Sequence, residues 1–163
     1  MSETILEIEN LSVVYETDME TVHAVNGISF SLGKGETLGL VGETGAGKTT
    51  TALTILGLLP ERTGKITGGA IRFEGTELGK LSAHEMEKIR GARISMIFQD
   101  PMSALNPVLT VGSQIAEALE LHNTDGLSKK EIEKRVEDTL EMVGIPKERK
   151  ANYPHQFSGG MRQ

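Results

Sequence analysis

Apolar and polar residues alternate in two stretches near the start of the chain. Residues 5–15 (ILEIENLSVVY) and 22–32 (VHAVNGISFSL) follow this pattern in part, are rich in β-branched residues and flank a polar break at residues 16–21. Alternation of this kind is typical of strands with one face toward a core, so the pattern predicts a strand pair. Residues 69–75 (GAIRFEG) predict a further strand, which we expect to join this pair.

Two other apolar runs are continuous rather than alternating. Thr37–Val41 indicates a strand that is covered on both faces, as in a parallel sheet, and it leads toward a predicted helix at residues 48–58. Residues 94–98 (ISMIF) predict another strand, which ends where Pro101 breaks the pattern.

From Leu81 onward the pattern becomes helical. Ser82–Glu85 and Ser128–Glu131 are capping-box sequences, and each predicts the start of a helix, the first of which ends near Arg90. Residues 110–122 predict a helix between them. Its expected apolar face comprises Ile115, Ala118, Leu119 and Leu121. The helix after the second box carries a stripe that we interpret as core rather than as a groove for a partner: Ile132, Val136, Leu140 and Val143.

Composition narrows the class of protein. The length of 163 residues suits about one domain, and a hydrophobic content of 37% suffices for a packed core. There is no cysteine, which excludes disulfides and thiolate metal sites. The longest apolar run, Ile55–Leu59, is too short to span a bilayer, and the acidic start is not a signal peptide, so we expect a soluble chain. A net charge of −6 argues against a broad nucleic-acid-binding face.

The most specific motif is GETGAGKT at residues 42–49, which is G-x-x-x-x-G-K-[ST] in full. Its three glycines permit a sharp turn from strand to helix that points backbone N–H groups into one hollow, where phosphate oxygens bind. We expect Lys48 to reach the β- and γ-phosphates of a nucleotide and the Thr49 hydroxyl to ligate Mg²⁺. A glycine-rich turn with a surface lysine is the alternative, which the order of strand, loop and helix disfavours.

Three segments together resemble the ATP-binding subunits of ABC transporters. They are GETGAGKTT (42–50), ISMIFQDPMSALNPVLTVGSQIAEAL (94–119) and FSGGMRQ (157–163), of which the middle one is most similar to the oligopeptide, dipeptide and nickel import group. The resemblance implies an α/β fold: a P-loop NTPase core with an N-terminal antiparallel β subdomain and a helical subdomain, truncated before the Walker B strand. The expected partial ATPase domain spans 1–163, with the β subdomain and phosphate-loop core in 1–79 and the Gln-loop and helical subdomain, up to the signature motif, in 80–163.

The resemblance also implies roles for single residues. Tyr15 matches an aromatic residue that stacks on adenine, and Gln99 matches a glutamine that contacts Mg²⁺ and the attacking water. The signature turn at residues 158–160 is expected to bind the γ-phosphate held by an opposing subunit. Without the family context, each of these would be read as an ordinary structural residue. The implied catalytic residues are Lys48 and Gln99, the implied metal ligands are Thr49 and Gln99, and the implied nucleotide-binding residues are Tyr15, Gly42, Glu43, Thr44, Gly45, Ala46, Gly47, Lys48, Thr49, Thr50, Ser158, Gly159 and Gly160.

One part of the family pattern is not found in these 163 residues. None of the four aspartates ends an apolar run followed by glutamate, and all four histidines precede the signature turn. We therefore expect the front part of an ATPase, which binds ATP at most, and we expect its uncovered apolar surface to cause self-association, exchange of an element or partial disorder.

The expected function is that of an ATP-binding subunit that powers import of peptides, or of nickel, by binding and hydrolysing ATP with Mg²⁺ in a head-to-tail dimer. Its expected partners are a second ATP-binding subunit, permease subunits and, indirectly, a solute-binding protein, but no nucleic acid; its expected place is the cytoplasmic face of the membrane. The alternatives are a non-catalytic nucleotide-binding or regulatory fragment, or another P-loop NTPase. A GTPase is disfavoured because no N-K-x-D or D-x-x-G stretch occurs.

Overall fold

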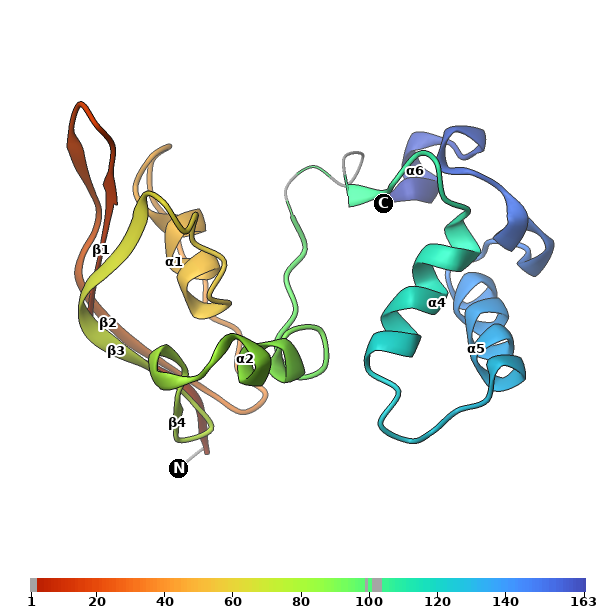
Figure 1. Ribbon diagram of the computed structural model, residues 1–163, viewed down its shortest axis with the longest axis horizontal. Helices are drawn as coiled ribbons and strands as arrows, with labels where there is room; N and C mark the ends of the chain where they lie inside the picture. The colour runs from red at the N-terminus through yellow and green to blue at the C-terminus, as the bar shows by residue number, and fades with distance from the viewer. Residues whose placement is uncertain (1–2, 99, 101–103) are drawn as a thin grey trace. The chain divides into compact units, whose positions relative to one another are not determined.

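A computed structural model describes residues 3–98, 100 and 104–163 of the chain. The chain divides into two compact units, and the boundary between them in the sequence lies between Arg90 and Gly91 (Figure 1). None of the helices among these described residues has the length and apolar character that a membrane crossing requires.

The first unit contains an antiparallel sheet with the strand order β2-β1-β3-β4, so β1 lies between β2 and β3. The alternating stretches at residues 5–15 and 22–32 are confirmed as its first two strands. The strand predicted at 69–75 is confirmed, but it begins at Gly64 and ends at Phe73, before a turn at residues 74–75. The strands are β1 (Thr4–Glu16), β2 (Thr21–Gly33), β3 (Gly64–Phe73) and β4 (Thr76–Glu77).

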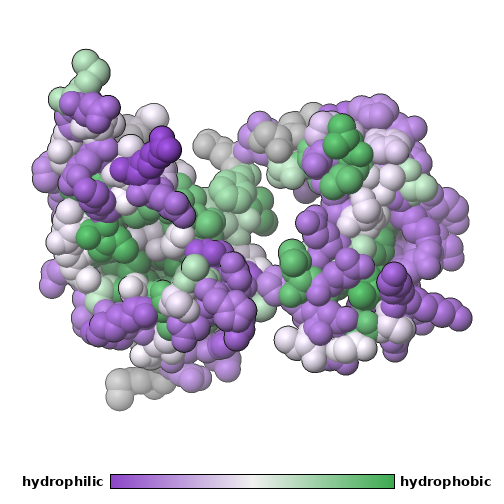
Figure 2. Space-filling view, in the orientation of Figure 1, coloured by the Kyte–Doolittle hydropathy of each residue, from purple (hydrophilic) through white to green (hydrophobic). Residues whose placement is uncertain are grey.

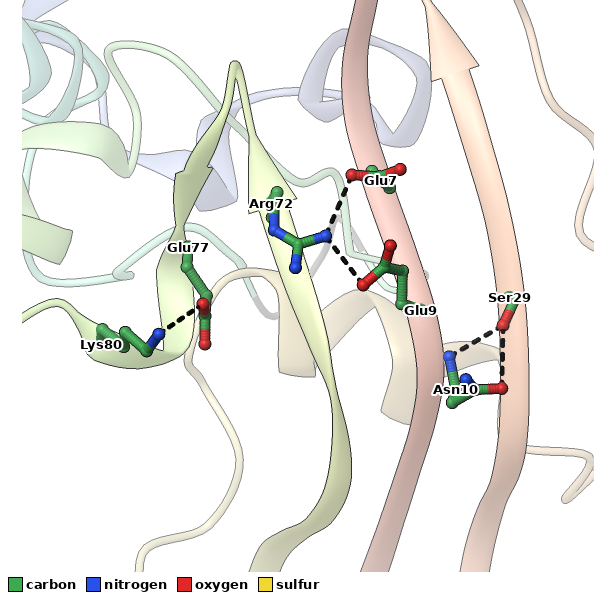
Figure 3. Close-up of polar contacts among 7 residues, drawn as sticks. All are labelled: Glu7, Glu9, Asn10, Ser29, Arg72, Glu77 and Lys80. Carbon is green, nitrogen blue, oxygen red and sulfur yellow. Dashed lines mark hydrogen bonds and ion pairs between the residues drawn. The ribbon is translucent and has the colours of Figure 1, made fainter.

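The two faces of the sheet differ in chemistry because strand side chains alternate. Ile8 and Leu11 of β1 are both buried in the core of the unit, because an irregularity in β1 between them shifts the alternation by one residue. On the other face, the guanidinium of Arg72 on β3 contacts the carboxylates of Glu7 at 3.1 Å and Glu9 at 2.8 Å (Figure 3). The hydrogen bonds that Arg72 donates to Glu9, the larger cause, and to Glu7 raise the pKa of Arg72. The pairs link β1 to β3 on the exposed side of the sheet.

Three helical segments complete the first unit: α1 (Lys48–Ile55), the 3₁₀ helix η1 (Leu78–Lys80) and α2 (Ala83–Ile89). The capping box predicted at the start of α2 is confirmed. Helix α1 ends three residues before the predicted Leu58, because Gly57 takes a left-handed φ of 61°. Arg90 donates to the carbonyl oxygens of Leu56 at 2.7 Å and Gly57 at 3.0 Å, which joins the end of α2 to the end of α1. The division of the family domain between residues 79 and 80 stays a prediction.

Two predicted strands are wrong. Residues 37–41 form no strand, and Leu38, Leu40 and Val41 are 47%, 45% and 90% exposed. Residues 94–98 likewise form no strand, and Ile97 is 95% exposed. A strand covered on both faces is held by its neighbours, and no strand within the described residues pairs with either segment. Apolar surface, green in Figure 2, is interspersed with hydrophilic surface on both units.

The second unit is helical and has its own core. It comprises α4 (Val111–Leu121), α5 (Lys129–Met142), η2 (Lys147–Ala151), η3 (Pro154–Gln156) and α6 (Gly159–Arg162). The capping box at Ser128 and Glu131 is confirmed at the start of α5. The core residues are Val111, Ile132, Val136, Leu140, Ile145 and Phe157.

The predicted apolar faces of the two long helices are correct in part. The stripe on α5 is confirmed except for Val143, which is 66% exposed because the chain turns at Gly144 (φ 76°) and places Ile145 in the core instead. On α4, Ile115 and Leu119 pack against the core as predicted. Ala118 and Leu121 lie off that face and are exposed, whereas Val111 and Ala116, which the prediction omitted, contribute to it.

Candidate phosphate-binding site

The loop at residues 42–47 owes its shape to two glycines in particular. Gly45 and Gly47 adopt left-handed φ angles of 85° and 79°, which non-glycine residues rarely take. A Cβ added at Gly47 would lie 2.2 Å from the carbonyl oxygen of Ala24 on β2, so the loop approaches the sheet as closely as backbone allows. Gly42 has no left-handed φ, and a Cβ there would meet Ala46 at 3.2 Å. Its contribution is close packing within the loop.

The side chain of Lys48 is directed back over this loop. Its Nζ donates hydrogen bonds to the carbonyl oxygens of Gly42 at 2.7 Å and Glu43 at 2.6 Å. The turn itself is closed by the N–H of Ala46, which donates to Glu43 O at 3.1 Å. An ammonium group carries three donors, so Lys48 places a positive charge at the loop where an anion can replace carbonyl partners.

The N-terminus of α1 follows the loop and favours the same kind of ligand. Its N-cap residue, Gly47, has no side chain with which to cap the helix, and the first turn contains no acidic residue. The first N–H groups of a helix lack intrahelical partners, and the helix dipole places partial positive charge there. Together with Lys48, this end of α1 forms a site suited to phosphate.

An aromatic residue from the sheet lies beside the same helix. Tyr15, near the end of β1, is half-buried, and its hydroxyl donates to Thr50 Oγ1 at 3.3 Å. Thr50 is in the first turn of α1. The structure therefore brings Tyr15, predicted to take the base, together with the helix that carries Lys48 and Thr49.

The remaining predicted residues are placed as follows. Glu43, Thr44 and Thr49 are exposed on the loop and the start of α1. Gln99 lies outside the described residues. The signature turn belongs to the second unit, where Ser158 is the N-cap of α6 and is exposed together with Gly159 and Gly160. Ser158 occupies the N-cap position of α6 as expected, but its side chain makes no capping hydrogen bond.

Sequence reasoning missed a residue that braces the signature turn. Arg149 on η2 donates from Nη2 to Gln156 O at 2.7 Å, and its Cζ lies 4.5 Å from the centroid of the Phe157 ring. Its Nη1 also contacts Met161 Sδ at 3.5 Å. The guanidinium thus contacts residues on both sides of the turn. No sequence pattern marks Arg149, which occurs in a run of basic and acidic residues.

Metal ligation has limited support from side chains alone. Over residues 3–98, 100 and 104–163, no three His, Asp or Glu side chains group as metal ligands. A hydroxyl ligand at Thr49 fits a cation that arrives with phosphate oxygens, because Mg²⁺ is usually bound through few protein ligands and substrate phosphates.

Comparisons with known proteins identify the family to which the chain is similar. The family described as "ABC transporter" matches residues 25–163. The dipeptide transport ATP-binding protein DppD of Bacillus subtilis is 55% identical over 163 residues, which cover 99% of this chain and 48% of that protein. The oligopeptide transport ATP-binding protein OppD of the same organism is 47% identical over 161 residues, 98% of this chain and 44% of that protein. The chain therefore spans about half the length of these curated relatives.

Solved structures show the same architecture. The dimeric post-hydrolysis state of the ATP-binding cassette MJ0796, bound to ADP and Pi, has a TM-score of 0.81 and 25% identity, covering 97% of this chain and 65% of that one. CbiO1 from Clostridium perfringens, part of the ABC transporter complex cbiONQ, has a TM-score of 0.71 and 27% identity, covering 99% of this chain and 58% of that one. The predicted α/β fold, a P-loop NTPase core with an antiparallel β subdomain and a helical subdomain, is confirmed.

Proposed function

We propose, from the premise that this chain belongs to the ABC transporter family, that its first unit binds ATP and that the protein is the ATP-binding subunit of a peptide importer. One observation carries the proposal: the Lys48 ammonium lies over the glycine loop at the uncapped N-terminus of α1. The choice of peptides over nickel rests on DppD and OppD, whose names specify dipeptide and oligopeptide transport.

The residues of the loop fit the triphosphate of a nucleotide. Backbone N–H groups of the loop and of the first turn of α1 would bind phosphate oxygens, while Lys48 neutralises charge on the β- and γ-phosphates. Thr49 would supply a hydroxyl ligand to Mg²⁺, which itself neutralises the charge that develops during phosphoryl transfer. Tyr15 would offer its ring to the base, and Gln99 would orient water.

The second unit supplies the surface through which two such subunits cooperate. In this proposal Ser158, Gly159 and Gly160 bind the γ-phosphate held by an opposing subunit, so two copies meet head to tail. The dimeric MJ0796 cassette supports such an arrangement. Permease subunits and, indirectly, a solute-binding protein complete the importer at the cytoplasmic face of the membrane. Nucleic acid is not a partner in this proposal, in keeping with a net charge of −6.

The 163 residues alone are expected to bind ATP without turning it over. None of Asp18, Asp100, Asp125 and Asp138 is followed by glutamate, so no Asp-Glu pair is available to polarise the attacking water. Phosphate release measured with Mg²⁺ and ATP should stay at background. A Mg²⁺-dependent turnover that Lys48→Ala abolishes would contradict this part of the proposal.

Titration calorimetry with MgATP tests the binding site itself. Lys48→Ala should weaken ATP binding by about tenfold or more, because charge-assisted hydrogen bonds contribute about 1.5–3 kcal/mol. Lys34→Ala is the matched control, since Lys34 is an exposed lysine of the same unit whose Nζ lies 3.9 Å from Glu3. The proposal fails if the folded wild-type chain gives no binding heat, or if the two variants bind ATP equally well.

A further inference from the structure

The threonine hydroxyls of α1 have different hydrogen-bond partners. Thr51 Oγ1 donates to Gly47 O at 2.9 Å, and Thr54 Oγ1 donates to Thr50 O at 2.6 Å, so both hydroxyls bond to the helix backbone. The Thr50 hydroxyl oxygen instead accepts the hydrogen bond from Tyr15, 35 positions away in the chain. Thr50 therefore joins the helix of the phosphate loop to the end of β1.

The two strand neighbours of Tyr15 differ in what they offer its ring. Tyr15 pairs with Val22 on β2 and with Gly64 on β3, and directly opposed residues of antiparallel strands place side chains on the same face. Gly64 has no side chain to pack beside the ring. A Cβ there would lie 2.9 Å from Leu59 Cβ, so the position is held as glycine by a contact unrelated to Tyr15. The hydrogen bond to Thr50 therefore links the Tyr15 side chain to α1, whereas its partner on β3 offers no side chain against which the ring can pack.

We propose that Thr50 is a positioning residue: its hydroxyl fixes the Tyr15 ring in the orientation that takes a purine base, and thereby makes the affinity for ATP depend on the base. This inference rests on the proposed function of the same site. A ring that is already ordered loses less conformational freedom when a base stacks on it, which improves affinity without any new contact to the ligand. Because Thr50 adjoins Thr49 in the first turn of α1, this one helix would position both the ring that takes the base and the residues that take the phosphates.

The first measurement separates the base from the phosphates. Dissociation constants for MgATP and for inorganic tripolyphosphate would be determined for wild type, Tyr15→Phe, Thr50→Val, Thr50→Ser and the Tyr15→Phe/Thr50→Val double variant. Tyr15→Phe keeps the stacking ring and removes its hydroxyl, and we expect it to weaken ATP binding about three- to tenfold while tripolyphosphate binding is unchanged. Thr50→Ser keeps the hydroxyl and should bind ATP as wild type does.

The double variant tests whether the two residues act through each other. If they do, the double variant should bind ATP no more weakly than Thr50→Val alone, because both variants lack the same hydrogen bond between the two side chains. Additive losses, or wild-type ATP affinity in Tyr15→Phe, would overturn the proposal. If tripolyphosphate binds but ATP gains nothing from its base, this inference fails while the phosphate site stands; if neither binds the folded wild type, the proposed function fails as well.

A second measurement needs no nucleotide. The chain has two tyrosines and no tryptophan, so a Tyr153→Phe background leaves Tyr15 as the only tyrosine, whose fluorescence is excited at wavelengths that phenylalanine does not absorb. In that background Thr50→Val should increase the quenching of Tyr15 fluorescence by acrylamide. It should also increase the amplitude of motion that NMR relaxation reports for a ¹³C-labelled Tyr15 ring. Thr50→Ser should return both quantities to their wild-type values. Circular dichroism confirms that the variants fold. Ring dynamics that do not respond to Thr50→Val would contradict the positioning role.

Discussion

Replacing Gly47 by alanine should destabilise the first unit in two separable ways. The φ of 79° costs an L-residue about 1–2 kcal/mol. The added Cβ would also lie 2.2 Å from the Ala24 carbonyl oxygen and 3.2 Å from Val25 Cγ2, and relieving such overpacking costs about 1–3 kcal/mol more. The expected total is about 2–5 kcal/mol, a large share of the roughly 5–15 kcal/mol by which a domain is stable.

Gly45 provides the matched control for this substitution. Its φ of 85° carries a similar strain, but a Cβ there would have no atom within 4 Å. Gly45→Ala should therefore cost only about 1–2 kcal/mol. The reduced freedom of the unfolded chain offsets both variants by about the same 0.4–1 kcal/mol, so it cancels in the difference between them. That difference isolates the collision with β2.

Urea unfolding followed by tyrosine fluorescence in a Tyr153→Phe background would measure both variants, because Tyr15 then reports on the first unit alone. The difference in unfolding free energy between Gly47→Ala and Gly45→Ala should be about 1–3 kcal/mol. Equal destabilisation by the two variants, or a larger loss for Gly45→Ala, would show that the loop does not pack against β2 as described.

Three further predictions concern the second unit. Hydrogen bonds from Ser128 lower the pKa of Glu131. This cap therefore stabilises the fold fully above the usual pKa of 4.5, and its contribution is lost as the pH falls through the lowered pKa. Glu131→Gln should flatten that part of the pH dependence of the melting temperature. Leu140→Ala should cost about 2–5 kcal/mol in urea unfolding, because Leu140 is buried, whereas Val143→Ala should stay within about 0.5 kcal/mol; similar losses would refute the assignment of the core. Arg149→Ala should cost about 1–3 kcal/mol and speed amide exchange in the signature turn, with partial recovery in Arg149→Lys; unchanged exchange would count against the brace.

Local patterns predicted the elements whose stability is local. Both capping boxes and the core positions Ile132, Val136 and Leu140 follow from spacing within one helix, and the structure confirms them. The first two strands of the antiparallel sheet were predicted because their apolar and polar residues alternate in part, whereas the two-residue strand β4 was not predicted. The phosphate loop was recognisable because its glycines serve the backbone of the loop itself, at Gly45 and Gly47.

The failures concern features that depend on distant residues. Residues 37–41 have the composition of a buried strand, but a strand of that kind exists only beside partners, which sequence alone does not supply. Val143 continues a helical stripe, and the left-handed turn at Gly144 takes it out of the core. The contact between Tyr15 and Thr50 joins residues 35 positions apart, and no local pattern signals it.

The hydrogen bonds of Lys48 have a consequence for the shape of the glycine loop. The carbonyl oxygens of Gly42 and Glu43 are neutral acceptors, so the ammonium group links the start of the loop to the start of α1 while its charge stays uncompensated by these partners. In the proposed function, a phosphate oxygen would replace a carbonyl oxygen as a partner of this charge. The lysine that we propose to bind phosphate is therefore also the residue that holds the glycine loop in shape.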